Sequence, residues 1–315
     1  MTGAARLARA EAHKLRRPLT MSVFLTVIGF LLANVSIAEM NGQQAMGQLR
    51  AMEEARACAT AQERASRACR SGERGRRMGE ALSPVTSHAE QDAATAALLQ
   101  SPSGGLLLAA DMWATLVGGF AIALLASGHV AGEWSGRTIG AVLVVYRPRH
   151  VFLLAKLVSV WLSGVGMLIL TAALFAALSP ILRSTFSLGQ VPVAVDTEPV
   201  GTVLALGRAA VVLGAYAALG CLCAMGIRSP LGTFIMMAGI LLAAMGLATF
   251  PGTDTFSPAD WVSGWMALHS GGQVPYLWTD RSTIGMPTSL AGIVLGTSAV
   301  LLWSRRQLTR MDVTT

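Results

Sequence analysis

The sequence is poor in charged residues, which excludes an ordinary soluble domain. Only 13% of its 315 residues are charged and 53% are hydrophobic, whereas soluble domains carry about 25% charged residues. Lysine occurs only at Lys14 and Lys156, so arginine supplies nearly all the basic charge of a chain with a net charge of +7. Several apolar runs are long enough to cross a bilayer. The sequence therefore predicts an integral membrane protein with several spans.

The familiar motifs of membrane enzymes and ATP-binding proteins are absent. The sequence has no His-Glu-x-x-His motif, no Gly-x-Ser-x-Gly motif and no pair of aspartates within an apolar run. Neither lysine follows a glycine-rich phosphate-binding loop, so ATP would have to be hydrolysed by another chain. We therefore predict no catalytic residue, metal site or cofactor here. The apolar runs also lack a central carboxylate, which argues against a proton-coupled carrier.

Cysteine is scarce, and its four residues form two pairs. Cys221 and Cys223 lie inside an apolar run, where we expect them to fill space rather than bind metal. Cys58 and Cys69 lie in a polar stretch. They are 11 residues apart, about three helical turns, so one straight helix cannot bring them together. The sequence leaves two alternatives for this pair: a disulfide across a bend in the chain, or two free thiols.

The N-terminal 17 residues predict an amphipathic helix on the cytoplasmic membrane surface. Its basic side gathers Arg6, Arg9, His13, Arg16 and Arg17. The alternative is a charged flank that only sets the topology. A signal peptide cleaved near Ala38 is a less favoured reading, because the apolar run is too long for a typical signal core.

The order of polar and apolar stretches predicts an all-α protein with six transmembrane helices and a helical extracellular insertion. In chain order we expect a first span at 18–38, an extracellular helical loop at 39–102, second and third spans within 103–178 joined by a cytoplasmic segment at 132–150, an extracellular loop at 179–200, fourth and fifth spans within 201–250, an extracellular segment at 251–287, a sixth span at 288–304 and a cytoplasmic tail at 305–315. Excess basic charge near both termini places them in the cytoplasm.

Some shorter features refine this topology. Arg228-Ser-Pro230 predicts a tight turn between the fourth and fifth spans. Aromatic residues in the segment 251–287 are typical of a membrane interface, and a short helix is expected at 261–268. Lys156 lies near the inner end of the third span, and we expect its side chain to extend towards the membrane surface. Asp111 and Arg208 fall near outer span ends and form a candidate outer gate.

The segment 132–150 is apolar in its middle and charged at both ends, so it should lie against the membrane or another protein. It resembles the loop between the second and third spans of membrane subunits in ATP-binding cassette (ABC) exporters of the ABC-2 type. That family shows a glutamate, Gly-Thr, apolar residues, a proline with arginines, and a lysine opening the third span. The corresponding residues here are Glu133, Thr138, the run 139–145, Arg147-Pro148-Arg149 and Lys156, with Arg137 where glycine is common.

The resemblance implies a permease subunit that exports a substrate from a bacterial cell across the plasma membrane. The residues it would place against the ATPase are Glu133, Arg137, Thr138, Tyr146, Arg147, Pro148 and Arg149. The implied partners are two copies of a separate ABC ATPase, which would bind ATP and Mg²⁺, a second permease, identical or paralogous, and membrane lipid, without nucleic acid. Because the spans carry few polar groups, we expect a hydrophobic or amphipathic substrate such as an antibiotic, lipid or peptide. A membrane sensor or assembly protein, a proton-coupled carrier and a membrane enzyme stay open as alternatives.

Overall fold

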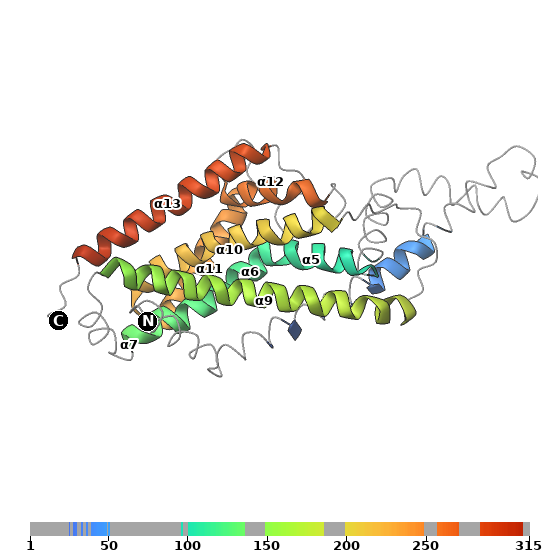
Figure 1. The fold of residues 1–315 in the computed structure, drawn as a ribbon, viewed down its shortest axis with the longest axis horizontal. Helices are drawn as coiled ribbons and strands as arrows, with labels where there is room; N and C mark the ends of the chain where they lie inside the picture. The colour runs from blue at the N-terminus through green and yellow to red at the C-terminus, as the bar shows by residue number, and fades with distance from the viewer. Residues whose placement is uncertain are drawn as a thin grey trace, which may run out of the picture. The chain divides into compact units, whose positions relative to one another are not determined.

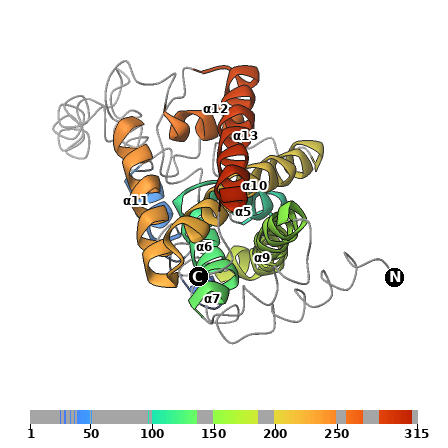
Figure 2. The same ribbon diagram turned by 90° about the vertical axis from the view of Figure 1, so that its left-hand side faces the viewer.

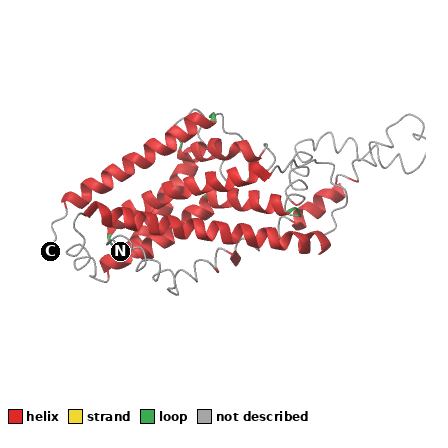
Figure 3. Cartoon of the chain, viewed as in Figure 1, coloured by secondary structure: helices red, strands yellow, loops and turns green. Residues whose placement is uncertain are grey.

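Helices dominate the described part of the chain (Figures 1 and 3). The structure, a computed structural model, describes residues 25, 28, 29, 33, 36, 39–48, 50, 96, 100–135, 149–185, 199–248, 257–270 and 284–310. Its elements are α5 (Pro102–Ala114), α6 (Leu116–Ala126), the π-helical turn η1 (Ser127–Ala131), α7 (Gly132–Ser135), α9 (Arg149–Thr185), α10 (Pro199–Ile227), α11 (Pro230–Ala248), α12 (Pro258–Ser270) and α13 (Met286–Arg310). These residues include no strand, so the prediction of an all-α fold is confirmed for them.

Four helical stretches are long and apolar enough to cross a membrane. They are Leu116–Trp134, Val151–Thr185, Gly201–Ile227 and Met286–Arg306. They fall on the predicted second, third, fourth and sixth spans, and their length and apolar composition support the prediction of a membrane protein. The predicted first span lies mostly outside the described residues. The predicted fifth span corresponds to α11, whose apolar part, Pro230–Ala244, is shorter than the other four.

The chain forms two compact units. One unit combines residues 1–29, 106–173 and 199–315, and the other combines 30–105 and 174–198. In the second unit the side chain of Glu39 is fully buried, and Gln100 Nε2 donates a hydrogen bond to its Oε2 at 3.4 Å. Of the predicted extracellular loop 39–102, the structure describes residues 39–48, 50, 96 and 100–102, and residues 39–48 are helical as expected.

Helix α10 is the centre of the first unit, where it contacts α6, α11, α12 and α13. Figure 2 shows it between α13 and α6. Small residues permit the close approach that helices in membranes use for packing. A Cβ added to Gly220 of α10 would lie 2.8 Å from the Ala126 Cβ of α6. A Cβ added to Gly292 of α13 would lie 2.6 Å from the Trp261 ring of α12. Helix α12 contains the predicted short helix at 261–268.

The predicted second span is not one continuous helix. It is interrupted at Thr115, which adopts an extended conformation with φ −95° and ψ −161° between α5 and α6. Backbone carbonyls freed by such a break must find donors inside a membrane protein. The Thr115 hydroxyl donates to the Met112 carbonyl at 2.7 Å, and the Tyr216 hydroxyl of α10 donates to the Ala114 carbonyl at 2.9 Å. The Thr115 N–H also donates to the Met112 carbonyl at 3.2 Å, so backbone and side-chain donors together satisfy the carbonyls at this break.

We predict that Tyr216→Phe destabilises the fold by about 1 kcal/mol, because it leaves the Ala114 carbonyl at the break without this donor. Denaturant unfolding in detergent micelles, followed by circular dichroism, measures the change. Ser184→Ala is the matched control, since it also removes one hydroxyl that donates to a backbone carbonyl, but at an exposed site. Equal stability of Tyr216→Phe and the unaltered protein would contradict this role for the tyrosine.

Candidate functional site

A buried ion pair joins α7 to α9. Lys156 Nζ lies 2.7 Å from Glu133 Oε1, and the two side chains are only 2% and 8% exposed. Lys156 Nζ also donates to the His129 carbonyl of η1 at 3.4 Å. One ammonium group thus holds both a carboxylate and a backbone carbonyl. Glu133 stands at the start of the segment 132–150 and Lys156 shortly after its end, so the pair fastens together the two points where this segment leaves and rejoins the helices.

The local sequence explains how the pair forms. Lys156 lies one helical turn after Phe152 in α9, so the two side chains share a face. The Lys156 Nζ lies 5.6 Å from the centroid of the Phe152 ring, close enough for a cation–π contact. On the other side, the π-helical turn η1 precedes α7, and such turns are rare and frequently occur at functional sites. The wider turn brings a carbonyl of η1 and the carboxylate of α7 to the same ammonium group.

The structure corrects the expectation that Lys156 extends to the membrane surface. Its side chain is 2% exposed and points to Glu133 instead. The reason is electrostatic. In apolar surroundings, the lysine ammonium group interacts more favourably with a carboxylate at 2.7 Å than with distant lipid headgroups. Burial removes both charges from water, which costs several kcal/mol per ion, and only a close and well-oriented pairing offsets that cost. Loss of one partner would therefore leave the other charge buried without its counter-ion.

A second contact links α7 to the turn between α10 and α11. The Arg228 Cζ lies 4.6 Å from the centroid of the Trp134 ring, a cation–π distance. Arg228 has a positive φ of 59°, which is uncommon for any residue except glycine. The predicted tight turn is present, and the Arg228 N–H donates to the Ala224 carbonyl at 3.0 Å. This backbone conformation ends α10 and directs the arginine towards α7.

We predict that Lys156→Met destabilises the protein by about 3–5 kcal/mol, because it leaves the Glu133 carboxylate buried without its counter-ion. The double variant Lys156→Met/Glu133→Gln should recover a large part of this loss, since neither charge then remains. Denaturant unfolding in micelles measures both. Arg183→Met, which removes an exposed cation from the same helix, should change stability by less than about 0.5 kcal/mol. A double variant as unstable as the single one would contradict a dominant ion pair.

The other residues predicted to contact the ATPase follow Glu133 in the segment 132–150. Arg137, Thr138, Tyr146, Arg147 and Pro148 lie outside the described residues. Arg149 is described only as the first residue of α9, without its side chain. Their contact with an ATPase stays a prediction.

The two cysteine pairs have different outcomes. Cys58 and Cys69 lie outside the described residues, so the disulfide also stays a prediction. Cys221 and Cys223 of α10 are buried free thiols, which agrees with the expectation that they fill space.

The candidate gate residues do not meet in the structure. Asp111 lies on α5 and Arg208 on α10, and these two described residues form no ion pair with each other. Arg208 is instead held by α12, with its Cζ 5.3 Å from the centroid of the Trp265 ring. The Trp265 indole N–H donates to the Arg208 carbonyl at 3.2 Å. The sequence did not predict this contact, although Trp265 is one of the aromatic residues of the segment 251–287 that indicated a membrane interface. A gating role for Asp111 and Arg208 stays a prediction.

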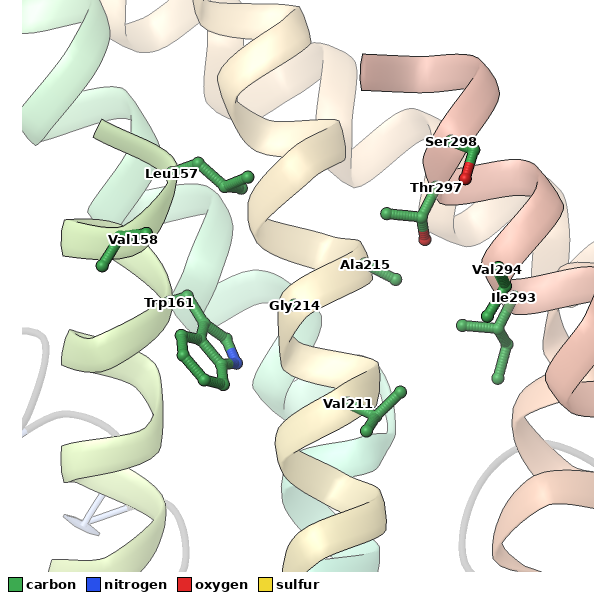
Figure 4. Close-up of a pocket in the computed structure, with 10 residues that line it drawn as sticks. All are labelled: Leu157, Val158, Trp161, Val211, Gly214, Ala215, Ile293, Val294, Thr297 and Ser298. Carbon is green, nitrogen blue, oxygen red and sulfur yellow. The ribbon is translucent and has the colours of Figure 1, made fainter. Parts of the chain in front are cut away.

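Two apolar cavities flank α10 in the first unit. The larger has a volume of about 310 Å³ and is bounded by α9, α10 and α13 (Figure 4). The smaller has a volume of about 220 Å³ and is bounded by α10, α11, α12 and α13. They share Ala215, Ile293 and Thr297 as walls. The described residues include no cluster of three or more histidine, cysteine or acidic side chains that could hold a metal ion.

The fold and the site thus define a helical membrane protein with a buried charge pair at one end of its spans. No family model, curated protein or solved structure matches this chain.

Proposed function

We propose that this chain is the membrane-spanning permease subunit of an ATP-driven exporter of the ABC-2 type. In this proposal a separate ATPase binds ATP and Mg²⁺ and hydrolyses ATP. The segment 132–150 inserts into a cleft of that ATPase and carries its movement to the membrane helices. Two permeases, identical or paralogous, face each other in the bacterial plasma membrane.

The single observation that carries the proposal is the buried pair of Glu133 and Lys156. These residues are the glutamate and the lysine that bracket the loop in the family resemblance, and they are 2.7 Å apart. A segment that transmits force must be attached firmly at both ends, and a buried ion pair resists displacement because separating it exposes two uncompensated charges to an apolar interior. A loop that only connected two spans would not need such an attachment.

The contact of Arg228 with Trp134 supports the same function. Through it, movement of α7 reaches α10 and α11 as well as α9. Helix α10 borders both cavities, and α11 borders the smaller one. A displacement of the segment would therefore alter the apolar spaces within the membrane part. Apolar walls suit the hydrophobic or amphipathic cargo that the sequence predicts.

The finer topology belongs to the same proposal. Residues 18–38 supply the first span and α11 the fifth, which gives six spans. An even number leaves both termini in the cytoplasm, where the basic flanks favour them. The loop 39–102 is then extracellular and forms a helical cap.

The proposal is tested by purifying the tagged chain from its native host in mild detergent, followed by mass spectrometry and an ATPase assay. We expect a chain with a Walker A motif to co-purify and to hydrolyse ATP. Replacing both Arg147 and Arg149 by alanine should lower the recovery of that chain at least tenfold, because the rim of the docking segment loses its charge pairing.

The matched control is the double variant Arg50→Ala/Arg183→Ala, which removes the same charge from the side predicted to be extracellular and should leave the recovery unchanged. A clean preparation of the chain without an ATPase would refute the exporter function. If the ATPase stayed bound after both loop arginines were replaced, it would dock on a surface other than the one proposed here.

We also predict a coupling defect for Arg228→Gln. This variant loses the cation–π contact, which is worth about 0.5–1 kcal/mol at an exposed site, so the fold should persist. Transport per ATP hydrolysed should fall, because α7 could then move without the turn that joins α10 and α11. Arg228→Lys keeps a cation and should restore most of the ratio. An unaltered ratio in Arg228→Gln, measured on the co-purified complex in vesicles, would show that this contact transmits nothing.

A further inference from the structure

The larger cavity opens as a groove on the membrane-facing side of the first unit. It runs along α10, with α9 and α13 as its walls, and it is called the α9–α13 groove below (Figure 4). Trp161 of α9 and Ser298 of α13 stand on opposite walls, and Gly214 of α10 lies on the floor. On α13 the lining extends from Ile293 to Ser298, about 7 Å at 1.5 Å per residue. The lining thus follows α13 for slightly more than one helical turn.

The rim of the groove is apolar and exposed. Val158 of α9 is 44% exposed, and Val294 of α13 is 50% exposed. The next large side chains outward are Leu162, 53% exposed, and Leu295, 70% exposed. Exposed aliphatic side chains on membrane spans face lipid tails, so the groove opens where lipid tails are. Water would find few hydrogen-bond partners between such walls and is a poor occupant.

Two arginines of α13 lie beyond one end of the groove. Val294, Ser298 and Arg305 are spaced four and seven residues apart on α13, so they lie along one face of that helix. Arg305 is exposed and lies seven residues beyond Ser298, about 10 Å further along the axis. Its neighbour Arg306 adds a second exposed guanidinium. In Figure 4, Ser298 lies at the same end of the groove as Leu157, one residue after the buried Lys156. A guanidinium binds phosphate oxygens in a bidentate geometry.

We propose that the α9–α13 groove binds one anionic phospholipid, with an acyl chain between α9 and α13 and its phosphate on Arg305. The apolar walls take the chain, the exposed rim admits it sideways from the bilayer, and the arginine fixes the headgroup. Arg305 favours an anionic over a zwitterionic headgroup, because a zwitterionic lipid carries its own cation next to the phosphate. The lipid would occupy the larger of the two cavities and would leave the smaller one to the cargo of the transport function proposed above. The bound lipid would join α9 to α13 at the end of the spans where Glu133 and Lys156 lie.

The test uses the full chain in nanodiscs of equimolar phosphatidylglycerol and phosphatidylcholine with identical acyl chains. The chain is transferred to detergent, and native mass spectrometry counts the lipids that remain bound. We expect the unaltered chain to retain one phosphatidylglycerol with at least a fivefold preference over phosphatidylcholine. Gly214→Leu should reduce retention at least fivefold, because a Cβ there meets the Trp161 ring at an ordinary 3.6 Å and the rest of the leucine then fills the groove.

The matched control is Gly207→Leu on the same helix. A Cβ at Gly207 meets no described atom within 4 Å, so this variant adds the same side chain outside the groove and should retain the lipid. Arg305→Gln should reduce the preference for phosphatidylglycerol to about one without abolishing lipid binding. Because Gly214→Leu could fail to fold, Val158→Trp, which blocks the groove at its rim, is measured alongside it and should also lose the lipid.

The proposal would be overturned by equal lipid retention in Val158→Trp and Gly207→Leu, which would mean that the groove is filled by another part of this chain or by a second copy. It would also be overturned if the unaltered chain held both lipids equally. A preference that survived Arg305→Gln would assign the headgroup to another cation and contradict the role given to Arg305.

Discussion

The buried pair of Lys156 and Glu133 is the interaction on which one end of the structure depends. In apolar surroundings a charge without its counter-ion is strongly destabilising. The pair therefore fixes the positions of α7 and α9 relative to each other. The same ammonium group also holds a carbonyl of η1. The geometry of the π-helical turn, the start of the segment 132–150 and the first turns of α9 are therefore set together. In the proposed exporter, this is the point at which force from an ATPase enters the membrane helices.

Helix α6 lies between two irregularities of the second span. Thr115 interrupts the helix on one side, and η1 widens it on the other. Between them, 11 helical residues contact α10 and α11. Breaks and π-turns are places where a helix can change direction. A displacement of α7 can thus be transmitted through η1 to α6, which moves as a short rigid helix. On the other side of the break, the Tyr216 hydroxyl joins the last residue of α5, Ala114, to α10.

The sequence predicted the fold class and most spans because long apolar runs leave few alternatives to a transmembrane helix. It also singled out Glu133 and Lys156, since charges beside spans are rare. It did not predict that they pair, because positions 23 residues apart on two sides of a loop have no fixed spacing. The break at Thr115 escaped prediction too, since an apolar run without proline gives little sign of it. The glycines at 118 and 119 were the only local signal. The α9–α13 groove could not be foreseen, because its walls come from three helices far apart in the chain.

The central claim, that the segment 132–150 docks on an ATPase, is tested most directly by photo-crosslinking in native membranes. A benzophenone amino acid in place of Tyr146 keeps an aromatic ring at a position that the proposal puts in the ATPase cleft. The same amino acid at Trp303, which is 60% exposed on α13, reports the lipid-facing surface. Docking of this segment on an ATPase predicts an adduct between position 146 and a chain with a Walker A motif, and none with that chain from position 303. Adducts from position 146 with lipid alone, or with a chain that lacks a nucleotide-binding motif, would contradict it.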